Sequence, residues 1–133
     1  MINLNDLSKL AVKYNYPLPE CFNGVYRVSA RSIYSTLKIC IPFTIWFSYV
    51  RHKLTCENGD DYTPIKNNVK GKIVKDYMVS LTVAGDMGLM YKPSRGEHLA
   101  KFYITYKQVI QWENITQLEN RIKALENKLG IIK

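Results

Sequence analysis

The last third of the sequence, residues 94–132, predicts one long helix, and this prediction constrains the fold more than any other feature. Ser94 and Glu97 have the spacing of a capping box, in which the hydroxyl and the carboxylate each accept a backbone N–H. From Leu99 onward, apolar residues recur at the three-and-four spacing of one helix face, at Phe102, Tyr106 and Val109. We therefore expect the first half of this helix to face a hydrophobic core.

Beyond Trp112 the apolar spacing becomes that of a coiled coil. The repeating residues are Ile115, Leu118, Ile122, Leu125, Leu129 and Ile132. With Ile115 at an a position, β-branched residues at a face leucines at d, which favours two parallel strands. The pattern predicts a homo-oligomer, with a parallel dimer favoured and a tetramer possible.

The charged residues beside this repeat agree with the parallel register. Arg121 falls at a g position and Glu126 at the following e position, so the two lie close across a parallel pair of helices. The repeat is shorter than the three to four heptads that identify a coiled coil securely. An alternative is that these residues fold back on the core of their own chain.

Length and charge limit the class of protein. A chain of 133 residues is one domain with at most a short appendage. Lys and Arg outnumber Asp and Glu by 19 to 11, giving a net charge of +8. This excess favours acidic partners, either nucleic acid or an acidic protein surface.

Cysteine usage and hydropathy predict an intracellular protein. Cys21, Cys40 and Cys56 are odd in number and scattered, which indicates neither a disulfide framework nor a zinc site. Residues 1–14 lack the apolar core of a signal peptide. The longest uncharged apolar run, residues 39–50, contains Pro42 and is too short for a membrane span, which needs roughly 20 residues.

The first half of the chain predicts short helices around a strand. Residues 4–14 form an amphipathic helix with Asn3 or Asn5 as the N-cap, and residues 25–28 form a strand. Ser29 caps a helix over residues 30–37, and residues 43–53 form a nearly uniformly apolar helix that we expect to be buried. That apolarity argues against a helix-turn-helix, whose recognition helix needs polar side chains to read base edges.

The middle of the chain predicts a basic β-hairpin. A strand over residues 62–65, broken by Pro64 and therefore at an edge, is followed by a connection longer than two residues and a strand over residues 73–81. The lysines near the tip are Lys66, Lys70, Lys72 and Lys75. They predict either a wing that touches DNA phosphates or a solvated loop that resists edge aggregation, and the absence of aromatic residues among them favours the loop.

A further helix, capped by Thr82 and carrying Asp86 in its first turn, should pack through Gly85 and Gly88 against the long helix. The fold class is therefore α+β: a mainly helical domain with a small antiparallel hairpin or sheet and a long C-terminal helix ending in a short coiled coil. The expected divisions are an N-terminal segment over residues 1–20, a domain over 21–107 and an oligomerisation helix over 108–133.

No catalytic motif is present. The sequence lacks a phosphate-binding loop, a zinc-protease pair and a nucleophile elbow. His98 and Asp86 could form an acid–base pair only if they met in a cleft, and a solvated surface is favoured. Cys40 and Cys56 are expected to be small buried apolar residues. We expect no enzymatic activity, no cofactor and no metal.

Three blocks together resemble a known family. The first is residues 28–34 with Leu37, the second is residues 43–47 followed by 60–62, and the third comprises Asp76-Tyr77, Ser80-Leu81-Thr82 and residues 100–104. This pattern is similar to the phage antirepressor domain of the AntA/AntB type, from residue 28 to about 107. The chain departs from the family pattern at residues 83–86, and Lys101 stands where the family has a basic residue.

The resemblance implies a protein that binds a phage repressor, relieves repression of lytic genes and acts in the cytoplasm of a bacterial host cell. Two alternatives stay open: a DNA-binding transcription regulator with a basic wing, and a phage protein that inhibits a host defence complex. The candidate partner contacts, chosen as charges near the ends of elements, are Arg27, Arg31, Arg51, Lys53, Lys92 and Arg95.

Overall fold

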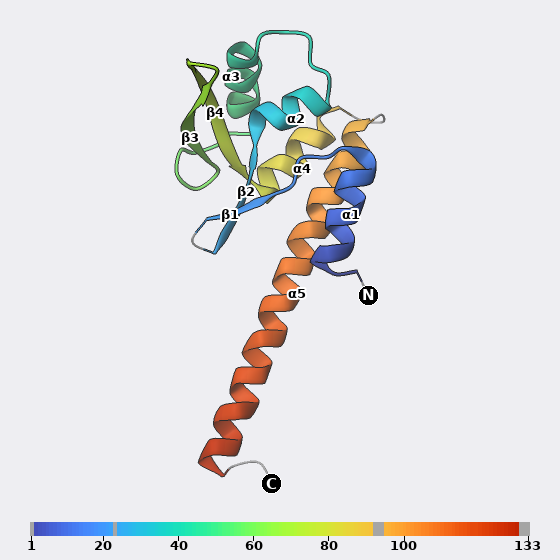
Figure 1. The fold of residues 1–133 in the computed structure, drawn as a ribbon, viewed down its shortest axis with the longest axis vertical. Helices are drawn as coiled ribbons and strands as arrows, with labels where there is room; N and C mark the ends of the chain where they lie inside the picture. The colour runs from blue at the N-terminus through green and yellow to red at the C-terminus, as the bar shows by residue number, and fades with distance from the viewer. Residues whose placement is uncertain (1, 23, 92–94, 131–133) are drawn as a thin grey trace.

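The computed structural model describes residues 2–22, 24–91 and 95–130, and Figure 1 shows a small domain from which one long helix projects. The elements are α1 (Leu4–Tyr14), β1 (Glu20–Phe22), β2 (Val25–Ser29), α2 (Ala30–Thr36), α3 (Phe43–Lys53), β3 (Tyr62–Val69), β4 (Lys72–Ser80), α4 (Leu81–Leu89) and α5 (Arg95–Leu129). The predicted α+β class is confirmed.

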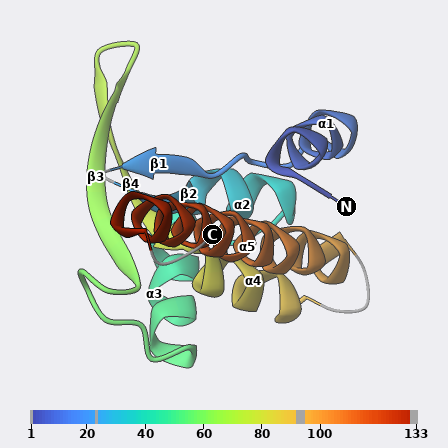
Figure 2. The same ribbon diagram turned by 90° about the horizontal axis from the view of Figure 1, so that it is seen from below.

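Helix α1 begins where its sequence predicts. The Asn3 side chain accepts from the Asp6 backbone N–H and the Asp6 carboxylate accepts from the Asn3 N–H, so Asn3 rather than Asn5 is the N-cap. Leu7 and Ala11 are buried, and α1 packs beside α5. Figure 2, seen from below, shows α5 with α1 on one side and α4 on the other.

The strands form an antiparallel sheet in the order β1-β2-β4-β3. Strand β3 lies at an edge, as Pro64 predicts, because proline cannot donate to a second neighbour. The sequence did not predict β1, whose three residues are all exposed and therefore show no alternation of apolar and polar side chains.

The β3–β4 hairpin is longer and its loop tighter than the sequence predicts. Val69 pairs with Lys72, so the loop contains only Lys70 and Gly71, and both have positive φ, 52° and 82°. The predicted longer connection is therefore wrong. A two-residue loop of this kind matches the right-handed twist of the flanking strands, which lets residues 67–69 continue the pairing.

Helices α2 and α3 cover part of the sheet. Ser29 caps α2 by accepting from the Ser32 N–H, as predicted. On α3, Phe43, Trp46, Phe47 and Val50 are buried, whereas Ile45 and Tyr49 are 60% and 53% exposed. The prediction of a fully buried helix is wrong for this outer face, because α3 has neighbours on one side only.

Helix α4 begins earlier than predicted. Strand β4 ends at Ser80, whose hydroxyl accepts from the Val83 N–H, so Ser80 is the N-cap and not Thr82. The Thr82 hydroxyl instead accepts from Lys107 Nζ on α5 at 2.7 Å. Asp86 consequently lies beyond the first turn, so the predicted interaction with the helix dipole does not apply.

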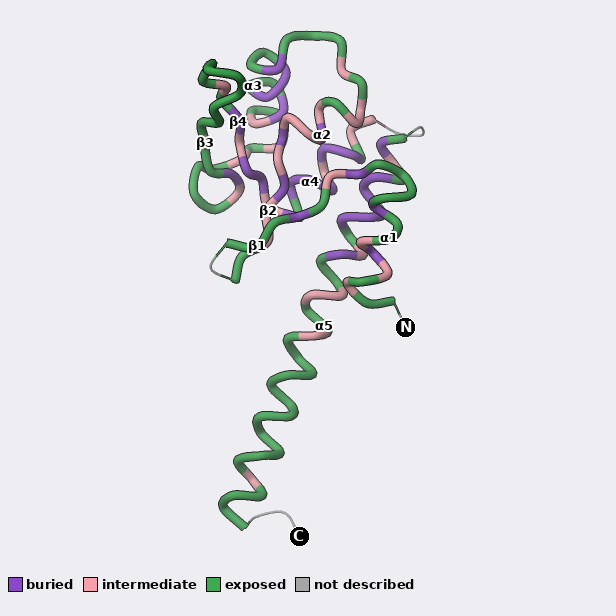
Figure 3. Tube along the Cα trace, in the orientation of Figure 1, coloured by how far each residue is buried: buried purple, intermediate pink, exposed green. Residues whose placement is uncertain are grey.

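The first half of α5 is part of the core. Leu99, Phe102, Tyr103 and Tyr106 are buried, which confirms the predicted core face, and Val109 packs against it while half-buried. Figure 3 shows the change along α5, from buried residues beside α4 to exposed residues over the distal half. The predicted cap at Ser94 lies outside the described residues.

Glycines allow α4 and α5 to approach closely, as predicted. A Cβ on Gly88 would lie 2.6 Å from the Gly96 carbonyl oxygen and 2.9 Å from the Ala100 amide nitrogen, both backbone atoms. At Gly85 the nearest atom to an added Cβ would be Ile104 Cγ1 at 3.4 Å, on a side chain that can move. The two glycines of α4 are therefore not equivalent.

We predict that Gly88→Ala lowers the free energy of unfolding by about 1–3 kcal/mol, because the added methyl forces the two helices apart. Gly85→Ala is the matched control, and it should be neutral or stabilising by up to about 1 kcal/mol because alanine favours the helix. Urea denaturation followed by circular dichroism measures both. Equal effects of the two substitutions would contradict this account of the α4–α5 contact.

Candidate interaction surfaces

The distal half of α5 carries an exposed row of apolar side chains, which we call the α5 stripe. Its members and their exposed fractions are Ile115 (49%), Leu118 (55%), Ile122 (53%), Leu125 (56%) and Leu129 (72%). The helix projects from the domain (Figure 1), so these side chains do not fold back on the core of their own chain. Ile132, the last predicted member, lies outside the described residues.

The charges beside the α5 stripe are available to a partner. Arg121 is exposed and Glu126 is half-buried. Among the described residues, the ion pair found is Glu97 with Lys101, in the proximal part of α5. Neither Arg121 nor Glu126 forms an ion pair with another described residue, as the predicted pairing between chains requires.

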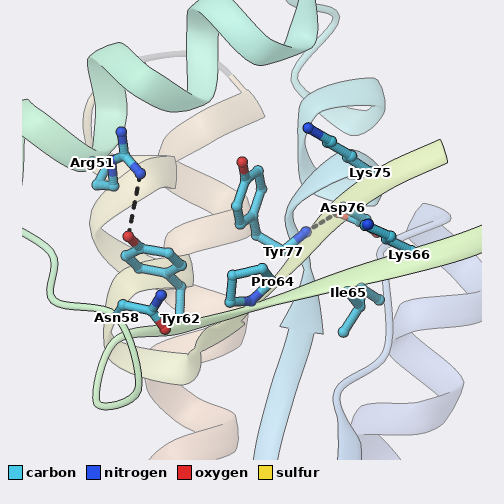
Figure 4. Close-up of a pocket in the computed structure, with 9 residues that line it drawn as sticks. All are labelled: Arg51, Asn58, Tyr62, Pro64, Ile65, Lys66, Lys75, Asp76 and Tyr77. Atoms are coloured by element: carbon cyan, nitrogen blue, oxygen red, sulfur yellow. Dashed lines mark hydrogen bonds between the residues drawn. The ribbon is translucent and has the colours of Figure 1, made fainter.

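A second surface is an open groove between the end of α3 and the β3–β4 hairpin, with a volume of about 600 Å³ (Figure 4). We call it the basic groove. Its lining residues are Arg51, Asn58, Tyr62, Pro64, Ile65, Lys66, Lys75, Asp76 and Tyr77. The sequence did not predict this surface, which unites two lysines of the proposed wing with one arginine of the proposed partner contacts.

The pairing register of β3 and β4 determines which side chains line the basic groove. Pro64 lies opposite Tyr77 and Lys66 opposite Lys75, so these four side chains share the sheet face that carries α3. The Tyr77 ring stacks on Phe47 of α3 at 4.0 Å between centroids and 9° between planes. Arg51 Nη1 donates to the Tyr62 hydroxyl at 3.2 Å. The packing of α3 on the hairpin thereby fixes the groove.

Asp76 holds the base of the hairpin to α2. Its carboxylate is 3% exposed and accepts from the Ser29 hydroxyl at 2.5 Å, from the Arg31 backbone N–H at 3.0 Å and from the Tyr77 N–H at 2.7 Å. These charge-assisted hydrogen bonds satisfy the carboxylate where β4 meets the first turn of α2. Of the two neighbouring residues Asp76 and Tyr77 that carry the family resemblance, Asp76 therefore stabilises the fold, whereas the Tyr77 side chain lines the groove.

Most of the predicted arginine contacts bind their own chain. Arg27 donates to the carbonyls of Met78 and Gly59, and Arg95 donates to the carbonyl of Thr36. Arg31 also binds its own chain: its Nε donates to the Lys75 carbonyl at 2.6 Å and its guanidinium lies 4.2 Å from the Phe43 ring centroid.

The other predicted charges have fewer contacts. Lys53 is exposed at the end of α3, next to the half-buried Arg51. Lys92 lies outside the described residues. Lys70 and Lys72 are exposed at the hairpin tip, which extends beyond the helices in Figure 2. Among the predicted site residues that the structure describes, Arg51, Lys66 and Lys75 together line the basic groove.

The residues that line the basic groove alternate along both strands of the hairpin, but the sequence alone does not show that they face one another. Tyr62, Pro64 and Lys66 alternate along β3, and Tyr77 and Lys75 alternate along β4. Their shared face follows only once the two-residue loop sets the register. The sequence has no aromatic residue among the lysines of the hairpin tip, whereas the fold brings Tyr62 and Tyr77 into the same groove lining as Lys66 and Lys75.

His98 and Asp86, considered above as a possible acid–base pair, have different partners and environments. His98 hydrogen-bonds through Nδ1 to the Tyr16 hydroxyl, not to Asp86. Burial raises the pKa of the Asp86 carboxyl, and the nearby Lys107 ammonium opposes that shift. Burial likewise raises the pKa of the Cys56 thiol.

Two further findings concern cysteines, metals and membranes. Cys40 is exposed, so its predicted burial is wrong, and Cys56 is half-buried.

Within residues 2–22, 24–91 and 95–130, no group of three or more His, Cys, Asp or Glu side chains could hold a metal ion. None of the helices in these ranges combines the length and apolarity needed to cross a membrane.

The fold and its surfaces define a small α+β domain, with helices packed on an antiparallel sheet, that continues into a long projecting helix. Residues 28–93 match the family model described as AntA/AntB antirepressor. The match confirms the predicted resemblance and is consistent with a phage antirepressor. No curated protein and no solved structure matches the chain.

The family match includes the basic groove but not the α5 stripe. It runs from β2 through α4 and so includes every residue that lines the basic groove. It ends at residue 93, short of residues 100–104 that we included in the resemblance. Helices α1 and α5, with the α5 stripe, lie outside the matched segment.

We predict that Asp76→Asn lowers the free energy of unfolding by about 1.5–3 kcal/mol, because an amide replaces a charged acceptor and its NH₂ group faces donors. Asp60→Asn, at an exposed position, is the control and should be near neutral. Thermal and urea denaturation measure both. An Asp76→Asn protein as stable as the wild type would contradict the anchoring role of this carboxylate.

Proposed function

We propose that this chain is an antirepressor that binds a phage repressor protein as a parallel homodimer and thereby derepresses lytic genes. The observation that carries the proposal is the α5 stripe, an exposed apolar row in coiled-coil register attached to an antirepressor-family domain. In this proposal residues 21–107 form the partner-binding domain and residues 108–133 form the oligomerisation helix. A tetramer is the less favoured assembly.

Helix stability supports self-association. Most helical stability in proteins comes from packing an apolar face, and short isolated helices are marginal in water. The distal half of α5 has no packing partner among the described residues of its own chain, yet it keeps a regular apolar row. A second copy would cover that row, and Arg121 of one chain would lie beside Glu126 of the other.

Two linked copies suit a dimeric target. A protein that binds the free repressor, and not the repressor on its operator, lowers the free repressor by mass action. Two binding sites on one assembly raise the effective concentration for the second contact. The charge of +8 favours an acidic surface on the repressor. The proposed place of action is the cytoplasm of the bacterial host, and the proposed activity is binding without catalysis.

The direct test is repressor release. Purified full-length protein, added to a repressor of the source phage bound to labelled operator DNA, should free the DNA in a gel-shift assay. A monomeric variant should need a higher concentration for the same effect because the second contact is no longer linked to the first. If every repressor of that phage stays bound at saturating protein, the antirepressor proposal is wrong.

We predict that Ile122→Asp converts the assembly to a monomer, because an isolated carboxylate at an a position cannot be buried without a partner. Asn120→Asp is the matched control: it adds the same charge at an f position, outside the seam, and should leave the mass unchanged. Multi-angle light scattering measures both. A wild-type protein that is already monomeric at high concentration would contradict the dimer.

Direct DNA binding is the second candidate, and the register of the hairpin favours it. Lys66 and Lys75 lie opposite one another and Lys70 and Lys72 flank the tip, so one hairpin presents four cations. Phosphate contacts of this kind predict affinity for random duplex that falls steeply with salt. Flat fluorescence anisotropy with labelled duplex at low salt would exclude this function.

A further inference from the structure

The basic groove holds positive charge that the chain itself does not neutralise. Lys66 and Lys75 are directly opposite residues of β3 and β4, an arrangement that is destabilising for like charges. Both side chains are exposed, and neither forms an ion pair with any carboxylate of the described residues. Arg51 on α3 adds a third cation to the same lining. An anionic ligand would relieve this repulsion.

The acidic residue of the lining does not supply that anion. Asp76 is buried, and its two oxygens accept from Ser29, Arg31 and Tyr77, so its charge is directed to the base of α2. Its hydrogen bonds hold β4 in place beneath the lysine pair. The cationic side chains therefore face a groove without a competing carboxylate.

The floor of the groove is apolar, and this feature selects the kind of anion. Pro64 on β3 lies opposite Tyr77 on β4, and the two side chains share the sheet face that carries Lys66 and Lys75 (Figure 4). The Tyr77 ring is half-buried and stacks on Phe47. Tyr62 is 6% exposed and its hydroxyl accepts from Arg51, so it offers no open ring on which a base could stack. A duplex backbone would use the cations but leave the apolar floor uncovered.

We infer that the basic groove binds an acidic peptide segment with an apolar side chain flanked by carboxylates. The apolar side chain contacts Pro64 and Tyr77, while the side chains of Lys66, Lys75 and Arg51 bind the carboxylates. This inference rests on the proposed function, since the segment would belong to the repressor, and it specifies which surface and which chemistry recognise it. Three of the residues predicted from the sequence then act at one site.

Fluorescence anisotropy of the full-length protein with a labelled peptide, Glu-Asp-Leu-Phe-Asp-Glu, tests the inference. We expect the Lys66→Glu/Lys75→Glu double variant to weaken binding by at least about tenfold, as the loss of charge-assisted hydrogen bonds implies. Lys9→Glu/Lys123→Glu, which changes the net charge equally at exposed positions outside the groove, should bind as the wild type does. A peptide with Ser in place of Leu and Phe should bind more weakly.

Three outcomes would overturn the inference: no binding of the acidic peptide by the wild type, equal weakening by both double variants, or binding only of random duplex DNA that the groove variant abolishes. Circular dichroism verifies that the groove variant is folded. Both lysines are exposed and make no ion pair in the described chain, and the variant keeps a like-charged pair at the same register. We therefore expect its melting temperature to be close to that of the wild type.

Failure of the inference and failure of the proposed function give different results. If the wild type releases repressor and the groove variant releases it equally well, the antirepressor function stands and the groove is not its contact site. If the wild type binds the acidic peptide but releases no repressor, the groove is a peptide site and the antirepressor proposal falls.

Discussion

The close contact between α4 and α5 is the interaction on which the rest of the structure depends. Gly88 and Gly96 bring the two backbones together so closely that neither position has room for a Cβ. This contact fixes the proximal part of α5 in the core, beside Leu99 and Tyr103. The distal part then projects as a continuation of an anchored helix, which determines where the α5 stripe can meet a partner.

The domain and the projecting helix carry different interaction surfaces. The antirepressor-family segment contains the basic groove, built by α3 packing on a β-hairpin that Asp76 attaches to α2. The helix outside that segment carries the apolar row. An assembly of two chains would place two copies of the groove at the end of one coiled coil. Two linked grooves could bind both subunits of a two-fold symmetric regulator.

Helices were predictable from the sequence wherever a local pattern determines them. The cap at Asn3, the cap at Ser29 and the buried face of α5 through Phe102 and Tyr106 follow from side chains a few residues apart. Strand register was not predictable, because the two-residue loop at Lys70 and Gly71 needs positive φ at a lysine, which local propensity disfavours. Without the register, neither the pairing of the lysines nor their proximity to Tyr77 could be derived, so the groove was missed.

The central claim is that identical α5 stripes meet in parallel, and disulfide cross-linking tests it most directly. In a protein whose three native cysteines are replaced by serine, Leu125→Cys places thiols of two chains side by side at a d position. The account predicts a covalent dimer for Leu125→Cys under mild oxidation, and none for the f-position control Asn127→Cys. A Leu125→Cys protein that stays monomeric, or that cross-links no better than the control, would contradict it.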